Sequence, residues 1–268
     1  MNRKLIAAVG ATAVVALSAC GSSTDDKPAA KITTARSSSA PATSGQTVEA
    51  EGAVDGQALA SKMVDAMIAS KTAHTTLIVN GASSGEGDYE FSSPLKVSMK
   101  MSQQGLNMEI VQVGGVTFIK GIPGMAKPWL KFDPKGTDTF SKLMSSLVDV
   151  SKSNDPRALV SVMEGVKGRD VGSEQMDGVP TEHYAFEVPL SAYGRVLSPE
   201  VLKLMQGMVK GPIAMGYWVD AGNLPRKLSS VMEISGKKQS TEITYSDWGK
   251  PVNIAAPPAA QVGKLPGQ

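Results

Sequence analysis

The chain has 268 residues, 41% of them hydrophobic, which is enough for a single domain with a sizeable core. Its charges nearly balance, with 27 Lys and Arg against 25 Asp and Glu, and no run of like charge is longer than Lys237-Lys238. Proteins that bind nucleic acids need a basic patch to hold phosphates, so this composition excludes nucleic acid as an expected partner.

The amino terminus has the order of a secretory signal peptide, with Arg3 and Lys4 before an apolar run from Leu5 to Leu17. This run is shorter than the roughly 20 apolar residues that a membrane-spanning helix needs. It ends in Leu17-Ser18-Ala19-Cys20, the pattern of the bacterial lipobox, whose cysteine is acylated and becomes the first residue after cleavage. We therefore expect residues 1–19 to be a signal peptide.

Cys20 is the predicted lipid-attachment residue, and acyl chains such as palmitate would hold the protein on the outer face of the cell membrane. It is the only cysteine, so the mature chain has no disulfide and no thiol for catalysis. Cleavage removes Arg3 and Lys4 but no acidic residue, which leaves the mature chain formally neutral. A secreted protein whose cysteine is incidental is the alternative.

Residues 20–52 are rich in Ser, Thr, Ala and Pro and lack Leu, Met, Phe, Tyr and Trp. Because such a segment cannot bury a core, it predicts a disordered tether with a root-mean-square span of about 30 Å. Residues 53–258 contain no low-complexity break and form the predicted folded domain. Residues 259–268 are a predicted flexible tail.

The first part of the domain combines a helix with short strands. A helix is predicted over 55–71, where apolar residues recur at helical spacing, and His74 is expected at its end. Strict alternation of apolar and polar residues then predicts an antiparallel hairpin over 95–101 and 106–110, with Gly105 at its turn. Short strands are also predicted over 116–120 and 129–132.

Helical spacing returns over 140–148 and again after Asp155-Pro156, where aspartate caps and proline takes the first helical position. A further helix is predicted from Ser198-Pro199. Alternating segments over 181–188, 213–220, 228–234 and 242–245 predict additional strands. The sum predicts an α+β domain in which a curved, mainly antiparallel half-barrel sheet wraps around a few helices.

The sequence offers no catalytic, metal or cofactor motif. His74 and His183 are the only histidines, and His183 alternates with Tyr184 and Phe186, which places it on the outer face of its strand. The chain has no Gly-x-Ser-x-Gly elbow, no pair of residues at metal-ligand spacing and no Gly-rich phosphate loop after a strand. We therefore predict a protein that is not an enzyme and has no cofactor.

Methionine is frequent, with 14 residues against 5 Phe and 3 Trp. Methionine is flexible and polarizable, which suits a surface that must fit more than one apolar shape. Two interpretations stay open: an apolar cavity with an adaptable lining, or a filled core that uses methionine as a filler. The candidate cavity-lining residues are Val97, Met99, Met101, Met108, Ile110, Phe118, Leu143, Met144, Leu147, Met163, Met205, Met215 and Met232.

Several segments resemble a known family in their order. They are residues 178–184, residues 216–228 with Leu224-Pro225 after a turn, residues 245–258, and the middle strands 114–120 and 129–133. Together with the lipobox they resemble the LppX/LprG group of actinobacterial lipoproteins, which share the half-barrel shape of the LolA and LolB carriers. The resemblance covers most of residues 54–258.

This resemblance implies a curved antiparallel sheet around helices, with an apolar cavity for the acyl chains of lipids or glycolipids and no catalytic residues. The leading hypothesis is a membrane-anchored lipoprotein that binds such lipids for transport across the cell envelope, with an envelope transporter as a candidate partner. The rival is a structural or interaction lipoprotein with a filled core that docks an envelope protein. The apolar, Gly-rich loop 121–126 suits either hypothesis, as a mobile lip or as a contact patch.

Overall fold

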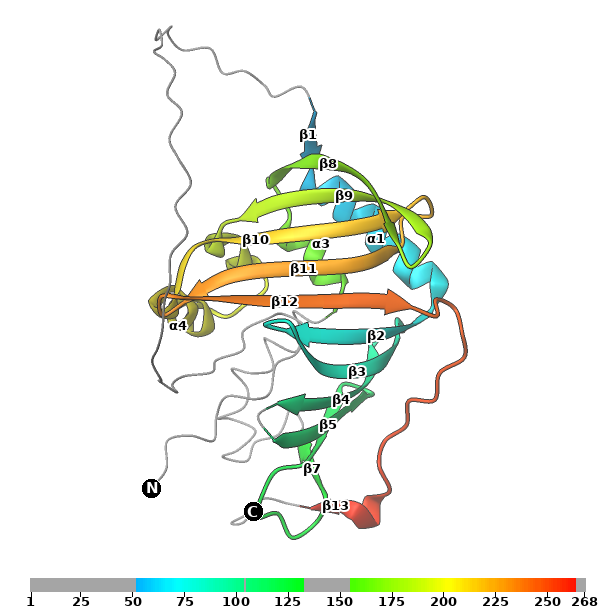
Figure 1. Ribbon diagram of the computed structural model, residues 1–268. Helices are drawn as coiled ribbons and strands as arrows, with labels where there is room; N and C mark the ends of the chain where they lie inside the picture. Colours follow the sequence, from blue (N-terminus) through cyan, green and yellow to red (C-terminus); the bar gives the residue numbers. More distant parts are fainter. Residues whose placement is uncertain (1–51, 104, 133–154, 264–268) are drawn as a thin grey trace, which may run out of the picture.

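The computed structural model describes residues 52–103, 105–132 and 155–263 (Figure 1). The predicted signal peptide, Cys20 and almost all of the predicted tether lie outside these residues. The helix expected over 140–148 lies outside them as well, and with it the candidate lining residues Leu143, Met144 and Leu147.

The strands of the described chain form one sheet in the order β1-β8-β9-β10-β11-β12-β2-β3-β4-β5-β6-β7-β13. They are β1 (Ala53–Asp55), β2 (Thr72–Val79), β3 (Ala82–Glu90), β4 (Lys96–Gln103), β5 (Leu106–Val113), β6 (Val116–Lys120), β7 (Trp129–Phe132), β8 (Lys167–Met176), β9 (Val179–Val188), β10 (Val209–Asp220), β11 (Pro225–Ile234), β12 (Lys237–Ser246) and β13 (Val262–Gly263).

The sheet consists of two meanders, β2 to β7 and β8 to β12, each of which follows the chain. They join where β12 pairs with β2, from Thr241 opposite Val79 to Ser246 opposite His74. All pairings are antiparallel except that of β13 with β7. The sheet is not closed on itself, and together with its helices it confirms the predicted α+β half-barrel.

The helix α1 (Gly56–Ser70) confirms the first prediction. Asp55 caps it, because its Oδ1 accepts a hydrogen bond of 2.9 Å from the backbone N–H of Ala58. Leu59, Met63 and Met67 follow at helical spacing, and all three are buried. The helix ends at Lys71, whose φ of 69° lies in the left-handed region.

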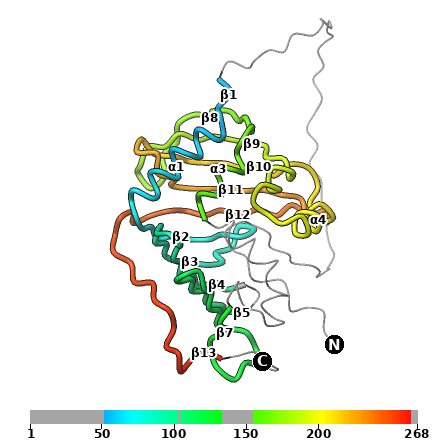
Figure 2. Tube along the Cα trace, turned by 180° about the vertical axis from the view of Figure 1, so that it is seen from behind, coloured from blue at the N-terminus to red at the C-terminus, as the bar shows by residue number. Residues whose placement is uncertain are grey.

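Two further helices are α3 (Arg157–Val162) and α4 (Pro199–Met208), and a short 3₁₀ helix, η1, covers Leu190–Arg195. We call the face of the sheet against which α1 packs the inner face, and the opposite one the outer face. The labelled helices lie at the level of β8 to β12 in both views (Figures 1 and 2).

Glycines in β3 let the sheet bend. Gly85 and Gly87 pair with Met101 and Met99 of β4. A Cβ atom at Gly87 would collide with the backbone carbonyl oxygen of Ser98, and one at Gly85 would lie 2.8 Å from that of Lys100. The two strands approach so closely that only glycine fits, which is a recurrent way to curve a sheet.

After β12 the chain returns along the outer face to β7. Gly249 N–H donates to the carbonyl oxygen of Thr72, and Ile254 packs among apolar residues of β5 to β7. Val262–Gly263 then pairs with β7, so the ordered domain extends beyond the predicted boundary at residue 258. Val262 is held there because it packs against the same apolar cluster as Ile254.

His74 is not at the end of the first helix, as the sequence suggested, but in β2. It faces outward beside Asp88, with 2.8 Å between Nδ1 and Oδ1. The helix ends at Ser70, before His74, because Lys71 leaves the helical conformation and β2 begins at Thr72.

Candidate functional site: the inner face of the sheet

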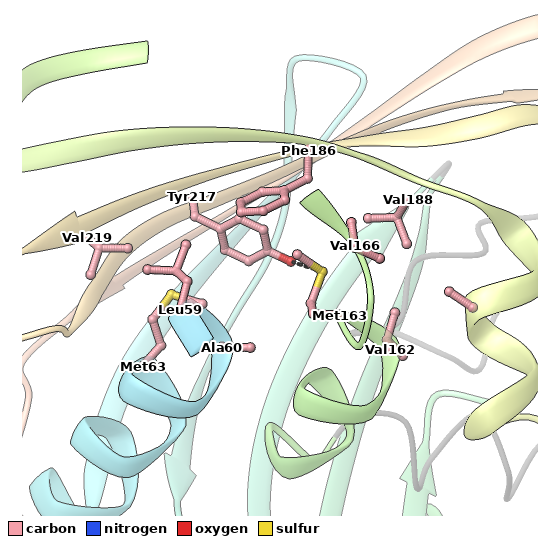
Figure 3. Close-up of a cluster of buried hydrophobic side chains, with 11 residues drawn as sticks. Leu59, Ala60, Met63, Val162, Met163, Val166, Phe186, Val188, Tyr217 and Val219 are labelled. Carbon is pink, nitrogen blue, oxygen red and sulfur yellow. Dashed lines mark hydrogen bonds between the residues drawn. The ribbon is translucent and has the colours of Figure 1, made fainter. Parts of the chain in front are cut away.

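One end of the inner face is filled by the protein's own side chains (Figure 3). Tyr217 is fully buried and meets Phe186 edge to face, with ring centroids 5.7 Å apart at 80°. Its hydroxyl lies 3.5 Å from Sδ of Met215 and 3.9 Å from Sδ of Met163. Burial raises the pKa of Tyr217 well above its ordinary value. With Leu59 of α1 in the same cluster, this end is a closed core.

Beyond this core the inner face of β4 to β7 presents an uncharged wall. Residues that pair directly across antiparallel strands share a face, and here Met99 pairs with Ile110, Met101 with Met108, and Ile110 with Ile119. The wall therefore runs continuously across the strands. Its residues are Val97, Met99, Met101, Met108, Ile110, Gln112, Thr117, Ile119, Leu130 and Phe132.

The end of α1 reaches the near edge of this wall, where Met67 packs with Met99. Of the elements in the described ranges, no helix lies over β5 to β7 (Figures 1 and 2). Most of the wall's apolar residues are nevertheless buried, since Val97, Met99, Met108, Ile119, Leu130 and Phe132 are at most 8% exposed, while Met101 and Ile110 are half-buried. The wall is thus an apolar face on whose far strands no helix of the described ranges packs.

Most of the candidate lining residues fall into two groups on the inner face. Val97, Met99, Met101, Met108 and Ile110 lie together in the wall on β4 and β5. Met163, Met215 and Met232 lie at the helix-covered end, where Met163 contacts Tyr217 and Met232 packs with Val209 and Ile213. Met205 belongs to neither group and is buried in α4. The structure brings each group together but separates the two along the sheet.

Phe118 does not belong to either group, and its assignment to the lining is corrected. It pairs with Val111 and Lys131, which places it on the outer face, while its neighbour Ile119 faces inward. Phe118 is buried because Ile254 of the returning segment covers it together with Trp129. Alternation made it look like an inward residue because both faces of β6 carry apolar side chains.

A polar patch lies in the middle of the inner face, and the residue pattern alone did not reveal it. Ser230 of β11 and Thr241 of β12 pair directly, and they are 7% and 3% exposed. Neither Ser230 Oγ nor Thr241 Oγ1 has a hydrogen-bond partner in the described part of the chain. By contrast, Thr75 on the same face donates to the carbonyl oxygen of Gly87. A sequence signal exists, since Ser230 alternates with the inward residues Leu228 and Met232.

The outer face carries a hollow of about 540 Å³ over β8 to β11. Small residues form its floor, and Trp218 stands at one side, stacked on His183 with ring centroids 3.9 Å apart. The indole N–H of Trp218 donates to Glu174 over 2.8 Å, which is the main reason why the pKa of Glu174 is lowered. The floor and rim residues include Ala185, Ala214, Gly216, Arg169 and Lys167.

The prediction that His183 faces outward is confirmed by this stack. Among the residues in the described ranges, no group of three His, Cys, Asp or Glu side chains is placed to hold a metal ion. Within the same ranges, no helix is long and apolar enough to cross a membrane.

No protein-family model matches the chain, and no curated protein matches its sequence. Among solved structures, the chain is similar to the Mycobacterium tuberculosis lipoprotein LppX, at 18% identity over 74% of this chain and 97% of that one, with a TM-score of 0.49. LprF from Mycobacterium bovis gives 16% identity over 75% and 96%, with a TM-score of 0.49. A LolA superfamily protein from Nitrosomonas europaea gives 9% over 72% and 92%, with a TM-score of 0.26. LppX belongs to the group that the sequence resembles, and at identities below 20% and TM-scores below 0.5 these similarities say nothing of what this chain binds.

Proposed function

We propose that the chain is an extracytoplasmic lipoprotein, anchored to the outer face of the cell membrane through acylated Cys20, that binds lipid or glycolipid acyl chains and carries them across the envelope. The observation that supports this most is the wall on β4 to β7. It is apolar, uncharged and rich in methionine, and among the described elements no helix covers its far strands. A surface of this kind suits hydrocarbon chains and no charged substrate.

The energetics favour a reversible carrier. Removing one methylene from water stabilises by about 0.8 kcal/mol, but an acyl chain in a bilayer already has that gain. A carrier therefore needs only to match the membrane to within a few kcal/mol, so that loading and release both occur. Methionine supports this, because its flexible side chain fits different chain shapes without one tight geometry.

The proposal includes no catalysis and no cofactor. The two histidines of the chain lie on the outer face, where each contacts a carboxylate, Asp88 for His74 and Glu174 for His183. An inner wall without titratable groups supports binding rather than turnover.

Lipid carriage is tested by organic extraction of the mature chain, expressed in a lipid-containing host, followed by mass spectrometry. Met101→Trp adds bulk to the half-buried wall, and Ser102→Trp adds the same bulk to the next residue, which faces outward and is exposed. We expect the first variant to lose lipid several-fold and the second to retain it, with both folds stable to within about 1–3 kcal/mol. Wild-type protein that carries no lipid and takes up none from vesicles would contradict the proposal.

The anchor is tested separately. Cys20→Ser removes the thiol to which the lipid would be attached, so the variant should accumulate as unprocessed precursor and take up no labelled fatty acid in growing cells. The control variant Ser23→Ala changes the neighbouring tether and leaves the lipobox intact, so it should be processed and labelled like wild type. Mature-sized Cys20→Ser protein released into the medium would contradict lipidation.

The hollow on the outer face favours a second candidate function, the docking of an envelope protein. The stacked rings of Trp218 and His183, beside the small residues Gly216 and Ala185, leave room for a side chain of such a protein. Ala214→Trp would fill the hollow without touching the inner wall. If Ala214→Trp no longer crosslinks to an envelope protein but has an unchanged lipid content, docking is supported. If the wild-type protein carries no lipid as well, docking is the main function.

A further inference from the structure

The paired hydroxyls of Ser230 and Thr241 lie at the centre of the inner face. They are register partners on β11 and β12, where directly opposed residues have Cβ atoms about 4.5–5.5 Å apart. Both side chains are more than nine-tenths buried. Two adjacent hydroxyls thus point into the same small region of the interior.

Neither hydroxyl has a hydrogen-bond partner among the residues that the structure describes. Buried hydroxyls nearly always have one, because an unsatisfied donor loses the bond it made to water. Thr75 shows that this face can satisfy a hydroxyl, since it donates to the carbonyl oxygen of Gly87 on the adjacent strand β3. The pair at Ser230 and Thr241 can therefore still bind a group that the described residues do not supply.

The surroundings define the chemistry of that group. Met215 pairs with Ser230 and Val79 pairs with Thr241, so the strands on either side present apolar side chains. Along β11 the inward neighbours are Leu228 and Met232, and along β12 they are Gln239 and Ile243. None of these residues is charged, so none of them would neutralise a phosphate or a carboxylate.

We infer that Ser230 and Thr241 bind a neutral ester carbonyl of the lipid. This inference rests on the proposed function. A carbonyl oxygen has two lone pairs and can accept one hydrogen bond from each hydroxyl. An ester linkage is the uncharged polar group that lies directly beside acyl chains. The ligand class is then a neutral, ester-linked acyl lipid, held by its linkage at the centre of the sheet and by its chains along the wall.

The test compares two probes on the full mature chain, a fluorescent diacylglycerol and its dialkyl ether analogue of the same chain length, which lacks the carbonyls. We expect wild-type protein to bind the ester probe about tenfold more tightly than the ether probe. The double variant Ser230→Ala/Thr241→Val removes both hydroxyls at nearly constant volume. It should lose this preference, bind the ether probe as before and unfold at no lower denaturant concentration than wild type.

The control variant is Ser229→Ala/Thr244→Val, which makes the same two substitutions on the same strands but on the outer face. It should keep the tenfold preference. Equal binding of ester and ether probes by wild type would overturn the inference and leave lipid binding intact. Binding of neither probe would overturn the proposed function and the inference with it. If the control variant loses the preference and the inner-face variant keeps it, the ester binds on the outer face, which would overturn the inference as well.

Discussion

Asp220 and Arg226 form an ion pair that closes the turn between β10 and β11, with 2.7 Å between Arg226 Nη2 and Asp220 Oδ2. The other oxygen of Asp220 accepts hydrogen bonds of 2.8 Å from Gly222 N–H and 3.0 Å from Leu224 N–H. The side chain of Asp220 is only 9% exposed. One carboxylate therefore fixes both the backbone of the turn and the first residues of the next strand.

Replacement of this carboxylate should destabilise the domain. Asp220→Ala leaves two backbone N–H groups and the Arg226 guanidinium without their acceptor, and we expect a loss of about 2–3 kcal/mol. Asp220→Asn keeps an acceptor for the two N–H groups but loses the charge, so its loss should be about 1 kcal/mol. Denaturant unfolding measures both, and equal stability of the two variants would show that the turn does not depend on the backbone hydrogen bonds.

Buried tyrosines should make stability fall in alkali. Burial raises the pKa of Tyr193 from 10.0 to about 12, and it raises those of Tyr217 and Tyr245 as well. From pH 10 to 12 the unfolded chain releases these protons while the folded chain keeps them. Stability is therefore fully present below pH 10 and falls above it by about 1.4 kcal/mol per pH unit for each buried tyrosine.

The contribution of one tyrosine can be isolated with Tyr193→Phe. The free energy of unfolding, measured at several values between pH 9 and 12, should fall less steeply above pH 10 in this variant, by about 1.4 kcal/mol per pH unit. Tyrosine absorbance in the ultraviolet reports whether the folded protein keeps its phenols neutral. Identical slopes for the variant and the wild type would mean that Tyr193 titrates normally in the fold.

Much of the fold could be predicted from the sequence, wherever one face of an element is apolar and the other polar. The hairpin of β4 and β5 is predictable because Val97, Met99 and Met101 alternate with polar residues, and α1 because Leu59 and Met63 recur at helical spacing. These elements bury one face against the core. The order of apolar and polar residue types therefore predicts these elements directly.

Strands without that pattern could not be predicted. β8 is exposed along almost its whole length, so Lys167–Met176 carries no apolar alternation. β3 has an inward face, but two of the positions on it are Gly85 and Gly87, which have no side chain to reveal the face. The candidate site was likewise predictable only where side chains are apolar, so the hydroxyls of Ser230 and Thr241 were not recognised.

The close approach of β3 and β4 gives a third prediction. Gly87→Ala would place a Cβ atom against the backbone carbonyl oxygen of Ser98, and backbone cannot move aside as a flexible side chain can. We expect a loss of at least about 2 kcal/mol, the cost of overpacking a rigid site. Gly81→Ala is a contrast, because nothing lies within 4 Å of its Cβ and only its φ of 78° opposes the change. Gly87→Ala with wild-type stability would show that the strands can separate there.

The two faces of β6 give the last prediction, since Phe118 and Ile119 are adjacent, buried and directed oppositely. Phe118→Ala should cost about 3–5 kcal/mol because Trp129 and Ile254 lose their contact on the outer face. Ile119→Ala should cost about 2–5 kcal/mol on the inner face. Both variants are thus comparably destabilised, so stability alone does not distinguish them.

Lipid content per folded molecule separates the two variants. Phe118→Ala should carry the same lipid as wild type, because the proposed ligand lies on the inner face. Ile119→Ala widens the wall and should change the amount or the chain length of the bound lipid, as measured by extraction and mass spectrometry of the folded fraction. A changed lipid load in Phe118→Ala, with none in Ile119→Ala, would place the binding surface on the opposite side of the sheet.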